Sequence, residues 1–244
     1  MNDNVVNICG VILAAGAGIR LGYPNELGGK PMVKVLEKPL LAYGLERLAD
    51  VGIKDIALVV NPINKPVIEE FAGDGSNWGV NITYMVQEKP LGIAHALFLC
   101  KEFTGGRKIL LLLVDNLFSA NISGFINAYS KDMKDNAEIF TVPVNNPQDY
   151  GVAVMQNGNL INLIEKPQQF ISNLAVIGLY LLPADVYDLI PMLKPSARGE
   201  LEITDVNNLF LQQERLHCNE LNGWWVDVGN ADRLSEAERL MQKN

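Results

Sequence analysis

The stretch from Gly10 to Val35 constrains the fold of this chain more than any other. It reads GVILAAGAGIRLGYPNELGGKPMVKV, so that an apolar run, residues 11–15, leads directly into Gly16-Ala-Gly18. Two cations follow, Arg20 and Lys30. This order predicts a buried strand that ends in a turn of small residues, whose backbone N–H groups can approach an anion. Because two cations beside such a turn have no packing purpose, we expect a polyphosphate ligand.

Two common phosphate-binding loops do not fit this stretch. The dinucleotide-binding pattern GxGxxG requires glycine at position 21, where the chain has Leu21. The nucleoside-triphosphatase pattern GxxxxGK[ST] fails because Pro24 stands where its first glycine belongs and Pro31 follows Lys30. A glycine turn after the first strand of an α/β domain can also be only a tight connection, so the cations carry the argument for phosphate.

Composition and charge exclude several classes of protein. With 244 residues, of which 48% are hydrophobic and 20% charged, the chain can bury the core of one large α/β domain. The formal net charge of −8 argues against binding to nucleic acid or to an anionic membrane, so local cations must hold any anion. Cys9, Cys100 and Cys218 lie far apart in apolar runs, which predicts reduced thiols in a cytoplasmic protein.

The sequence gives no sign of a zinc site, a signal peptide or a membrane span. The two histidines, His95 and His217, form no ligand spacing with the cysteines. The first apolar run has no basic region before it and ends in Gly-Ala-Gly instead of a cleavage site. No apolar segment is long enough to cross a bilayer. We therefore expect a protein without membrane or nucleic-acid partners.

Strand and helix patterns alternate through the first half of the chain. The segments 55–61, 81–86 and 108–114 are predicted strands, and the first and last of them are continuously apolar, as in parallel strands covered on both faces. Helices are predicted from Pro39 to about Gly52 and over 67–71. This alternation predicts a doubly wound, Rossmann-like α/β fold with a mostly parallel sheet. Further predicted elements are a helix over 123–133, a strand over 137–144, a hairpin of 149–154 and 160–164 that turns at Asn157-Gly158, a strand over 216–221 and a helix over 231–242.

Two predicted strands deliver polar side chains to their carboxyl ends, where ligands of open α/β sheets bind. Gln87 follows the strand 81–86, and Asp115 follows the strand 108–114. A carboxylate at a buried strand tip can hold Mg²⁺, which leaves its other sites for phosphate and water. The structural alternatives are an Asx turn or helix cap for Asp115 and a plain surface turn after Gln87.

Six motifs together resemble the sugar-1-phosphate nucleotidyltransferases, and most of all the glucose-1-phosphate thymidylyltransferases. The segments that carry the resemblance are 10–35 (family GGxGxRLxPxTxxxxKxLxPV), 87–92 (QxxPxG), 114–116 (GDN, here Val-Asp-Asn), 150–180 (YGV, EKP and AVTGLY), 195–205 (PSxRGELEITD) and 225–229 (WxDxG). They span nearly the whole chain in the family's order. The resemblance implies one nucleotidyltransferase domain, 1–244, with a nucleotide-binding part over about 8–120 and a sugar-phosphate-binding part over about 121–230, which carries an inserted β-hairpin region for the sugar.

The resemblance also implies a role for each matching residue. The expected nucleotide-binding residues are Ala14, Ala15, Gly16, Ala17, Gly18, Arg20, Lys30, Gln87, Gly92 and Asp115. The expected sugar-phosphate-binding residues are Asn116, Gly151, Glu165, Lys166, Val176 and Arg198. The expected Mg²⁺ ligands are Asp115 and Asp227, and with Arg20, Lys30 and Lys166 they form the expected catalytic group. Without the family, Arg198 could simply pair with Glu200 or Glu202 at the surface.

The implied reaction transfers a nucleotidyl group from dTTP or UTP to a sugar 1-phosphate, glucose 1-phosphate by resemblance, and releases pyrophosphate. The attacking phosphate is already ionised at neutral pH, so no general base is required. The amide of Gln87 can accept from N3–H of the pyrimidine and donate to O4. Two alternatives stay open: a uridylyl- or cytidylyltransferase with another acceptor, or a regulatory module without turnover, which would explain the departures at Ala14-Ala15, Lys34 and Val114.

The distance from the WxDxG motif to Asn244 bears on regulation. Long thymidylyltransferases continue past this motif by several helices, which help to build an assembly surface and a second nucleotide site. Here one amphipathic helix follows Gly229. We therefore expect hyperbolic kinetics, no feedback site of that type, and a monomer or homodimer.

Overall fold

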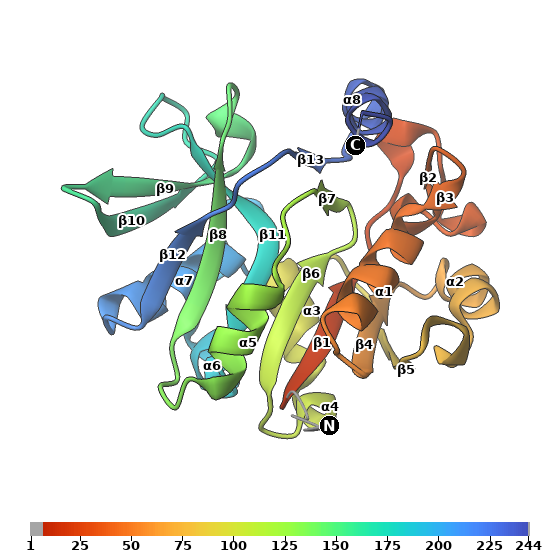
Figure 1. The fold of residues 1–244 in the computed structure, drawn as a ribbon, viewed down its shortest axis with the longest axis horizontal. Coiled ribbons are helices and arrows are strands. Elements are labelled where there is room, and N and C mark those ends of the chain that lie inside the picture. Colours follow the sequence, from red (N-terminus) through yellow and green to blue (C-terminus); the bar gives the residue numbers. More distant parts are fainter. Residues whose placement is uncertain (1–6, 244) are drawn as a thin grey trace.

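The computed structural model describes residues 7–243 apart from the side chain of Arg20, and the strand that precedes the glycine turn lies inside its main sheet (Figure 1). This strand, β1, is flanked by β4 and β6, and the main sheet runs in the order β10-β9-β11-β6-β1-β4-β5, with β8 joined to β11 and β12 to β8. The strands of this sheet are β1 (Ile8–Leu13), β4 (Asp55–Val60), β5 (Asn81–Val86), β6 (Lys108–Leu113), β8 (Ala137–Pro143), β9 (Gly151–Gln156), β10 (Asn159–Glu165), β11 (Leu174–Leu182) and β12 (Leu216–Glu220).

Helices cover both faces of the sheet, which explains why its central strands are apolar without alternation. Successive residues of a strand point to opposite faces. Ile12 therefore joins a core under α1, and Val11 joins a second core under α3 and α7. The helices are α1 (Leu40–Asp50), α2 (Lys65–Ala72), α3 (Ile93–Phe98), α4 (Lys101–Thr104), α5 (Ser123–Lys131), α6 (Val186–Leu189), α7 (Ile203–Gln212) and α8 (Ala231–Met241). The predicted doubly wound α/β fold is confirmed.

The half of the sheet that contains β6, β1, β4 and β5 is parallel throughout. Their carboxyl ends consequently lie along one edge, where Figure 1 shows β6 continuing into the short strand β7 (Asn116–Phe118). The other half is mixed: β11 runs antiparallel to β6, β8 and β9, and β12 runs parallel to β8. Because β11 bonds directly to β6, the predicted nucleotide and sugar parts share one sheet, and the boundary at about 120 remains a prediction.

Most predicted elements are present with small shifts of their ends. The hairpin turn is confirmed: Asn157 and Gly158 both have positive φ angles, 51° and 80°, as a two-residue turn of this kind requires. The strand β11 and the pairing of β7 with β13 (Trp225–Asp227) went unpredicted. Neither Thr204 nor Asp205 caps α7, because the helix starts at Ile203 and both residues lie within its first turn.

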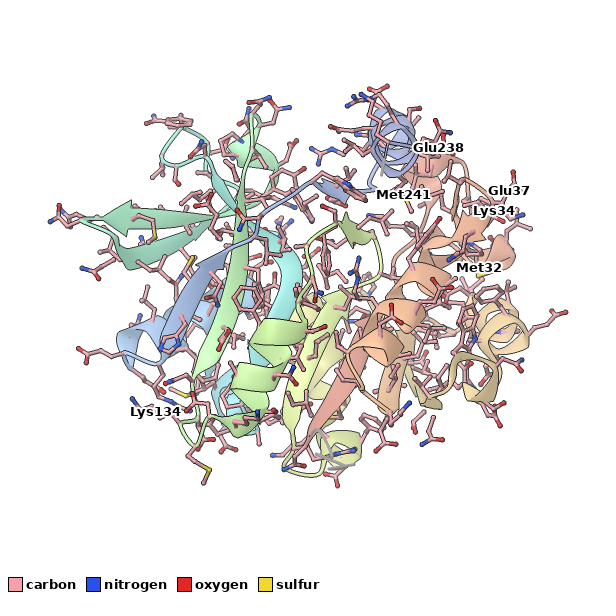
Figure 2. All side chains as sticks on the ribbon, viewed as in Figure 1. Met32, Lys34, Glu37, Lys134, Glu238 and Met241 are labelled. Carbon is pink, nitrogen blue, oxygen red and sulfur yellow. The ribbon has the colours of Figure 1, made fainter. Side chains whose placement is uncertain are left out.

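The last helix contacts the segment that follows the glycine turn. Leu36, at the turn between β2 (Lys34–Val35) and β3 (Lys38–Pro39), donates its backbone N–H to Oε1 of Glu238 at 3.2 Å. Figure 2 shows Glu238 and Met241 of α8 beside Lys34 and Glu37. The C-terminal helix and the N-terminal loop region are thus held together near Lys30.

The cysteines behave as the sequence predicts for thiols of the core. Cys9 and Cys100 are fully buried, and burial raises the pKa of their thiols to about 11 and about 12. Cys218 is partly buried, and burial raises the pKa of its thiol as well. Within residues 7–243, no helix combines the length and the apolar character that a membrane crossing needs.

Candidate active site

The carboxyl ends of the parallel strands open into a cavity of about 520 Å³. Seven of the ten expected nucleotide-binding residues line it: Ala15, Gly16, Ala17, Lys30, Gln87, Gly92 and Asp115. Ala14 lies buried behind the turn, and Gly18 lines a neighbouring cavity that begins at the same turn. The expected role of Arg20 concerns a side chain outside the described part of the protein.

The glycine turn presents free backbone donors to this cavity. Within residues 7–243, the N–H groups of Ala15, Gly16 and Ala17 donate no hydrogen bond to protein, whereas the carbonyl of Gly16 accepts from the N–H of Lys30 at 3.2 Å. Backbone N–H groups that converge without partners suit an anion. Val114, which stands where the family has glycine, contributes little surface to the cavity because the residue is only 4% exposed.

Three asparagines that the sequence analysis missed hold the turn in place. Asn64 is fully buried, and its Nδ2 donates to the carbonyls of Ala14 at 2.9 Å and Gly28 at 3.3 Å. Asn61 donates to the carbonyl of Ala15 at 2.9 Å and to Oδ1 of Asn25 at 3.1 Å. The available signal was the position of Asn61 directly after a buried strand, at the edge where ligands bind.

Lys30 brings the two expected metal ligands together. Its Nζ atom hydrogen-bonds Oδ2 of Asp115, and Oδ1 of Asp227 lies 3.5 Å away. Asp115 lies two residues after the end of β6, and Asp227 ends β13, whose antiparallel pairing with β7 places it opposite Asn116. Three segments that lie far apart in the sequence thus meet at one ammonium group.

The three charges shift each other's titration. Burial disfavours the charged form of Lys30, but the two carboxylates outweigh it, so the pKa of its ammonium group is raised. Burial also opposes ionisation of Asp115, yet its contacts with Lys30 and Asn116 keep the pKa of its carboxyl below the usual range. Burial and the nearby Asp115 raise the pKa of Asp227 to about 7. The single positive charge of Lys30 therefore does not fully compensate the negative charges of two partly buried carboxylates.

The donor set fits a hard divalent cation such as Mg²⁺. Oδ1 of Asp227 is buried and has no hydrogen-bond partner in the described protein. Within residues 7–243 no group of three His, Cys, Asp or Glu side chains could form a complete metal cage. Mg²⁺ is usually held by one or two carboxylates and keeps its other positions for water and substrate phosphate. Asp115 and Asp227 match that pattern.

Asn116, an expected sugar-phosphate-binding residue, makes three hydrogen bonds within the protein. It is 7% exposed, and its Nδ2 donates to Oδ1 of Asp115 at 2.8 Å. Its Oδ1 accepts from the backbone N–H of Gly178 and from Nε1 of Trp225, both at 2.7 Å. The amide thus ties β7, β11 and β13 together and orients the first carboxylate.

A second cavity, of about 140 Å³, lies on the other side of the carboxylates. Five of the expected sugar-phosphate-binding residues line it together with both aspartates: Asn116, Gly151, Glu165, Lys166 and Val176. Thr204 donates to Oε2 of Glu165 at 2.6 Å, and a Cβ on Gly151 would stand 3.1 Å from the same oxygen. Glu165 is therefore fixed in direction, which suits a carboxylate that accepts hydrogen bonds from hydroxyl groups.

Lys166 stands in a strained conformation beside this cavity. Its backbone φ of 43° lies in the left-handed region that residues other than glycine rarely adopt. Its N–H donates to the carbonyl of Tyr150 at 2.9 Å. Strained residues of this kind cluster at functional sites. Lys166 also lines a third cavity, of about 680 Å³, with Gly18, Lys30 and Asp227.

Two arginines near the cavities pair with acidic side chains, and for Arg198 this is the alternative that the sequence allowed. Arg233 of α8 went unpredicted, yet it lines the third cavity, donates to Oδ2 of Asp149 at 2.9 Å and stacks on Tyr150. Arg198, an expected phosphate ligand, instead donates to Oε2 of Glu202 at 2.8 Å and to Oε1 of Glu165 at 3.2 Å. Arg198 thus contacts Glu165, which lines the second cavity, and its role as a phosphate ligand stays a prediction.

Comparisons with known proteins agree with this arrangement. The family model described as nucleotidyl transferase matches residues 9–244. The chain is 39% identical over 237 residues to a glucose-1-phosphate thymidylyltransferase of Xanthomonas campestris pv. campestris (strain B100), which covers 96% of this chain and 80% of that protein. It is 39% identical over 235 residues to a low-salt glycan biosynthesis nucleotidyltransferase of Haloferax volcanii, covering 95% of this chain and 65% of the relative.

Solved structures show the same fold. A Bacillus anthracis protein assigned as a glucose-1-phosphate thymidylyltransferase, solved in complex with a sucrose, superposes with a TM-score of 0.90 and 38% identity, over 97% of this chain and 96% of that one. A UDP-glucose pyrophosphorylase complexed with UDP-glucose superposes with a TM-score of 0.84 at 22% identity, over 97% and 99%. The chain therefore belongs to the nucleotidyl transferase family, and it is similar over nearly its whole length to glucose-1-phosphate thymidylyltransferases.

Proposed function

We propose that the chain transfers a nucleotidyl group from dTTP or UTP to a sugar 1-phosphate, with glucose 1-phosphate as the acceptor, and releases pyrophosphate. The observation that carries the proposal is the meeting of three cavities at Asp115, Asp227 and Lys30. One cavity has the glycine turn, one has the fixed carboxylate of Glu165, and one holds several cations. A nucleotide, a sugar and a pyrophosphate need such an arrangement around one phosphorus atom.

The chain's own groups supply alignment and charge. The free N–H groups of Ala15, Gly16 and Ala17 bind oxygens of the triphosphate, and Lys30 neutralises the departing pyrophosphate. Lys166 holds the attacking phosphate, and Glu165 accepts hydrogen bonds from the sugar hydroxyls. The phosphate monoester is ionised at neutral pH, since its second pKa is about 6, so no general base takes part. In-line attack then inverts the configuration at the α-phosphorus, and preorganised charge supplies the acceleration.

Asp115 and Asp227 would hold Mg²⁺, which supplies positive charge against the oxygens of the α-phosphate when it is bound. This assignment explains why a second carboxylate is buried beside the first with only one lysine for compensation. The choice of thymidylyl transfer to glucose 1-phosphate is supported by the similarity to named thymidylyltransferases. The buried thiols suit the reducing cytoplasm, and a monomer or homodimer remains our prediction for the assembly.

Measuring pyrophosphate release over a grid of nucleoside triphosphates and sugar 1-phosphates, with and without Mg²⁺, tests the proposal. We expect the highest kcat/KM for dTTP or UTP with glucose 1-phosphate, and no release without the cation. Release with another pair would support the alternative acceptors or bases. Tight nucleotide binding without any turnover would contradict the proposed enzyme and favour the alternative, a regulatory module.

A further inference from the structure

The side chain of Gln87 reaches the nucleotide cavity in one fixed direction. Gln87 directly follows β5, where its N–H donates to the carbonyl of Val60 at 2.8 Å, and its side chain is 8% exposed. Its Nε2 atom lies 3.2 Å from the carbonyl oxygen of Gly92 and 3.1 Å from Nδ1 of His95. Both partners belong to the start of α3, Gly92 as the residue before its first turn and His95 within that turn.

The two contacts decide which atoms carry hydrogen. A backbone carbonyl can only accept, so the amide nitrogen of Gln87 must face Gly92. The second amide hydrogen then faces Nδ1 of His95, which must accept it and therefore carries no proton. The proton of the neutral imidazole consequently lies on its Nε2 atom. A flipped Gln87 would set its oxygen against the oxygen of Gly92 and against the lone pair of His95.

The carbonyl of Gly92 cannot turn away to accommodate such a flip. Its φ of 101° belongs to the region that favours glycine, and a Cβ there would stand 2.4 Å from the carbonyl oxygen of Leu201. Leu201 in turn bonds Leu91 through its N–H at 2.8 Å and accepts from Ala94 at 3.2 Å. The carbonyl of Gly92 that faces Gln87 also accepts the N–H of Ala96 at 3.1 Å, which holds it at the start of α3.

This geometry leaves Gln87 one group for a ligand. Both amide hydrogens are used within the protein, and no hydrogen bond among residues 7–243 uses the Oε1 atom. An acceptor opposite position 3 of the base suits the N3–H of thymine or uracil, whereas N3 of cytosine is itself an acceptor and the donor of cytosine, its 4-amino group, lies at the neighbouring position. Donation from Gln87 to O4 of the pyrimidine, which the sequence analysis expected, has no hydrogen left to use.

We propose that His95 is a specificity-determining residue: by accepting from Gln87, it fixes the amide so that a base with N3–H is preferred to cytosine. His95 does not touch the base; it positions the side chain that does. The inference rests on the proposed function, because it assumes that a pyrimidine nucleotide enters this cavity. It adds the imidazole of His95 as the group that makes Gln87 favour uracil or thymine over cytosine.

Equilibrium binding of UTP and CTP, measured by calorimetry with Mg²⁺ and without acceptor sugar, tests the inference apart from turnover. These two nucleotides share the ribose and triphosphate and differ only at the base edge. We expect His95→Phe, which cannot accept, to narrow the UTP-to-CTP affinity ratio by about two- to tenfold. His95→Asn places an amide oxygen near the position of Nδ1 and should retain the ratio.

Each outcome separates the inference from the proposed function. An unchanged ratio in His95→Phe, or an equal loss in both variants, would overturn the role of His95 and leave the proposed reaction standing. Equal affinities for UTP and CTP in the unmodified protein would overturn base reading itself, while pyrophosphate release measures the reaction independently. If His95→Phe does not fold, the ¹⁵N chemical shifts of the imidazole in the unmodified protein decide: a neutral ring with its proton on Nδ1 contradicts the inference.

Discussion

The ammonium group of Lys30 lies 3.5 Å from Oδ1 of Asp227 and hydrogen-bonds Asp115 at the same time. The lysine thus occupies the space between two carboxylates in which a divalent cation would bind. The side chains of these three residues are 17–29% exposed, so water screens their charges only in part. If a cation binds as proposed, it shares both partners with Lys30, so removal of Lys30 should strengthen the effect of the cation on stability.

Lys30→Met tests this relationship through stability. Without the ammonium group, two carboxylates remain partly buried beside each other, so the free energy of unfolding should fall by about 3 kcal/mol. Mg²⁺ should restore more of the thermal midpoint in the variant than it adds to the unmodified protein, because it replaces the lost charge. Thermal denaturation with and without Mg²⁺ measures both effects. A midpoint that does not change on substitution would show that the carboxylates do not depend on Lys30.

The two carboxylates should be indispensable for turnover and dispensable for folding. Asp115→Asn and Asp227→Asn each keep the size of the side chain and remove a charged ligand, so Mg²⁺-dependent pyrophosphate release should disappear while the circular dichroism spectrum stays the same. Asp232→Asn, at an exposed position in the first turn of α8, is the matched control and should retain activity. Near-normal kcat at saturating Mg²⁺ would remove the affected aspartate from the metal site.

Lys166 combines a charge with backbone strain, and two substitutions separate the contributions. Lys166→Ala and Lys166→Gly both remove the ammonium group, so each should cost about 10²–10³ in kcat/KM. Only glycine relieves the positive φ of 43°, so the glycine variant should be more stable than the alanine variant by about 1 kcal/mol.

Chemical denaturation and steady-state kinetics of both variants provide the measurements. Lys194→Ala, an exposed lysine that lines a different cavity, is the control and should leave kcat/KM unchanged. If that control lost as much activity as the Lys166 variants, the loss would come from the lower positive charge of the whole protein and not from the position of Lys166. Equal stability of the two Lys166 variants would contradict the strain.

Glu138 gives the protein a pH dependence of stability away from the candidate active site. Burial raises the pKa of its carboxyl above the ordinary value of 4.5, and the nearby His217 and Asn219 offset this only in part. The folded state therefore holds the proton more tightly than the unfolded state, and the free energy of unfolding falls as pH rises from 4.5 through the raised pKa.

Glu138→Gln removes this ionisation while its amide oxygen can still accept from Asn219, which donates to Glu138 at 3.0 Å. We expect the variant to be more stable than the unmodified protein at pH 7 and equally stable at pH 4. Urea denaturation at both pH values checks the sign. A larger gain at pH 4 than at pH 7 would contradict it.

Local patterns predict the elements of this fold well, and the reason is visible in particular segments. The strand 108–113 is recognisable because its apolar run leads to Asp115, and the turn at Asn157-Gly158 because few other residues adopt its dihedral angles. The strand β11 went unpredicted, since its antiparallel place beside β6 depends on residues about 70 positions away.

The candidate site divides in the same manner. The glycine turn, Gln87 and Asp115 can be found from the sequence because each follows a predicted strand, whereas Asp227 was found through the resemblance of residues 225–229 to a family motif. The ion triad of Lys30 was not foreseeable, because its partners lie 85 and 197 positions along the chain and no local rule joins them. Asn64 and Arg233 escaped for the same reason, and the setting of Asn116 became visible only through its contacts, whereas the pairing of Arg198 with Glu202 was one of the two interpretations that the sequence allowed.

The pairing of β13 with β7 also fixes the order in which a growing chain completes its site. The nucleotide cavity takes nearly all of its lining from residues 13–115, which leave the ribosome first. Asp227 reaches Lys30 only after β13 has paired with β7, more than a hundred residues later in synthesis. A nascent chain therefore carries nearly all of the lining of the nucleotide cavity more than a hundred residues before it has the second carboxylate.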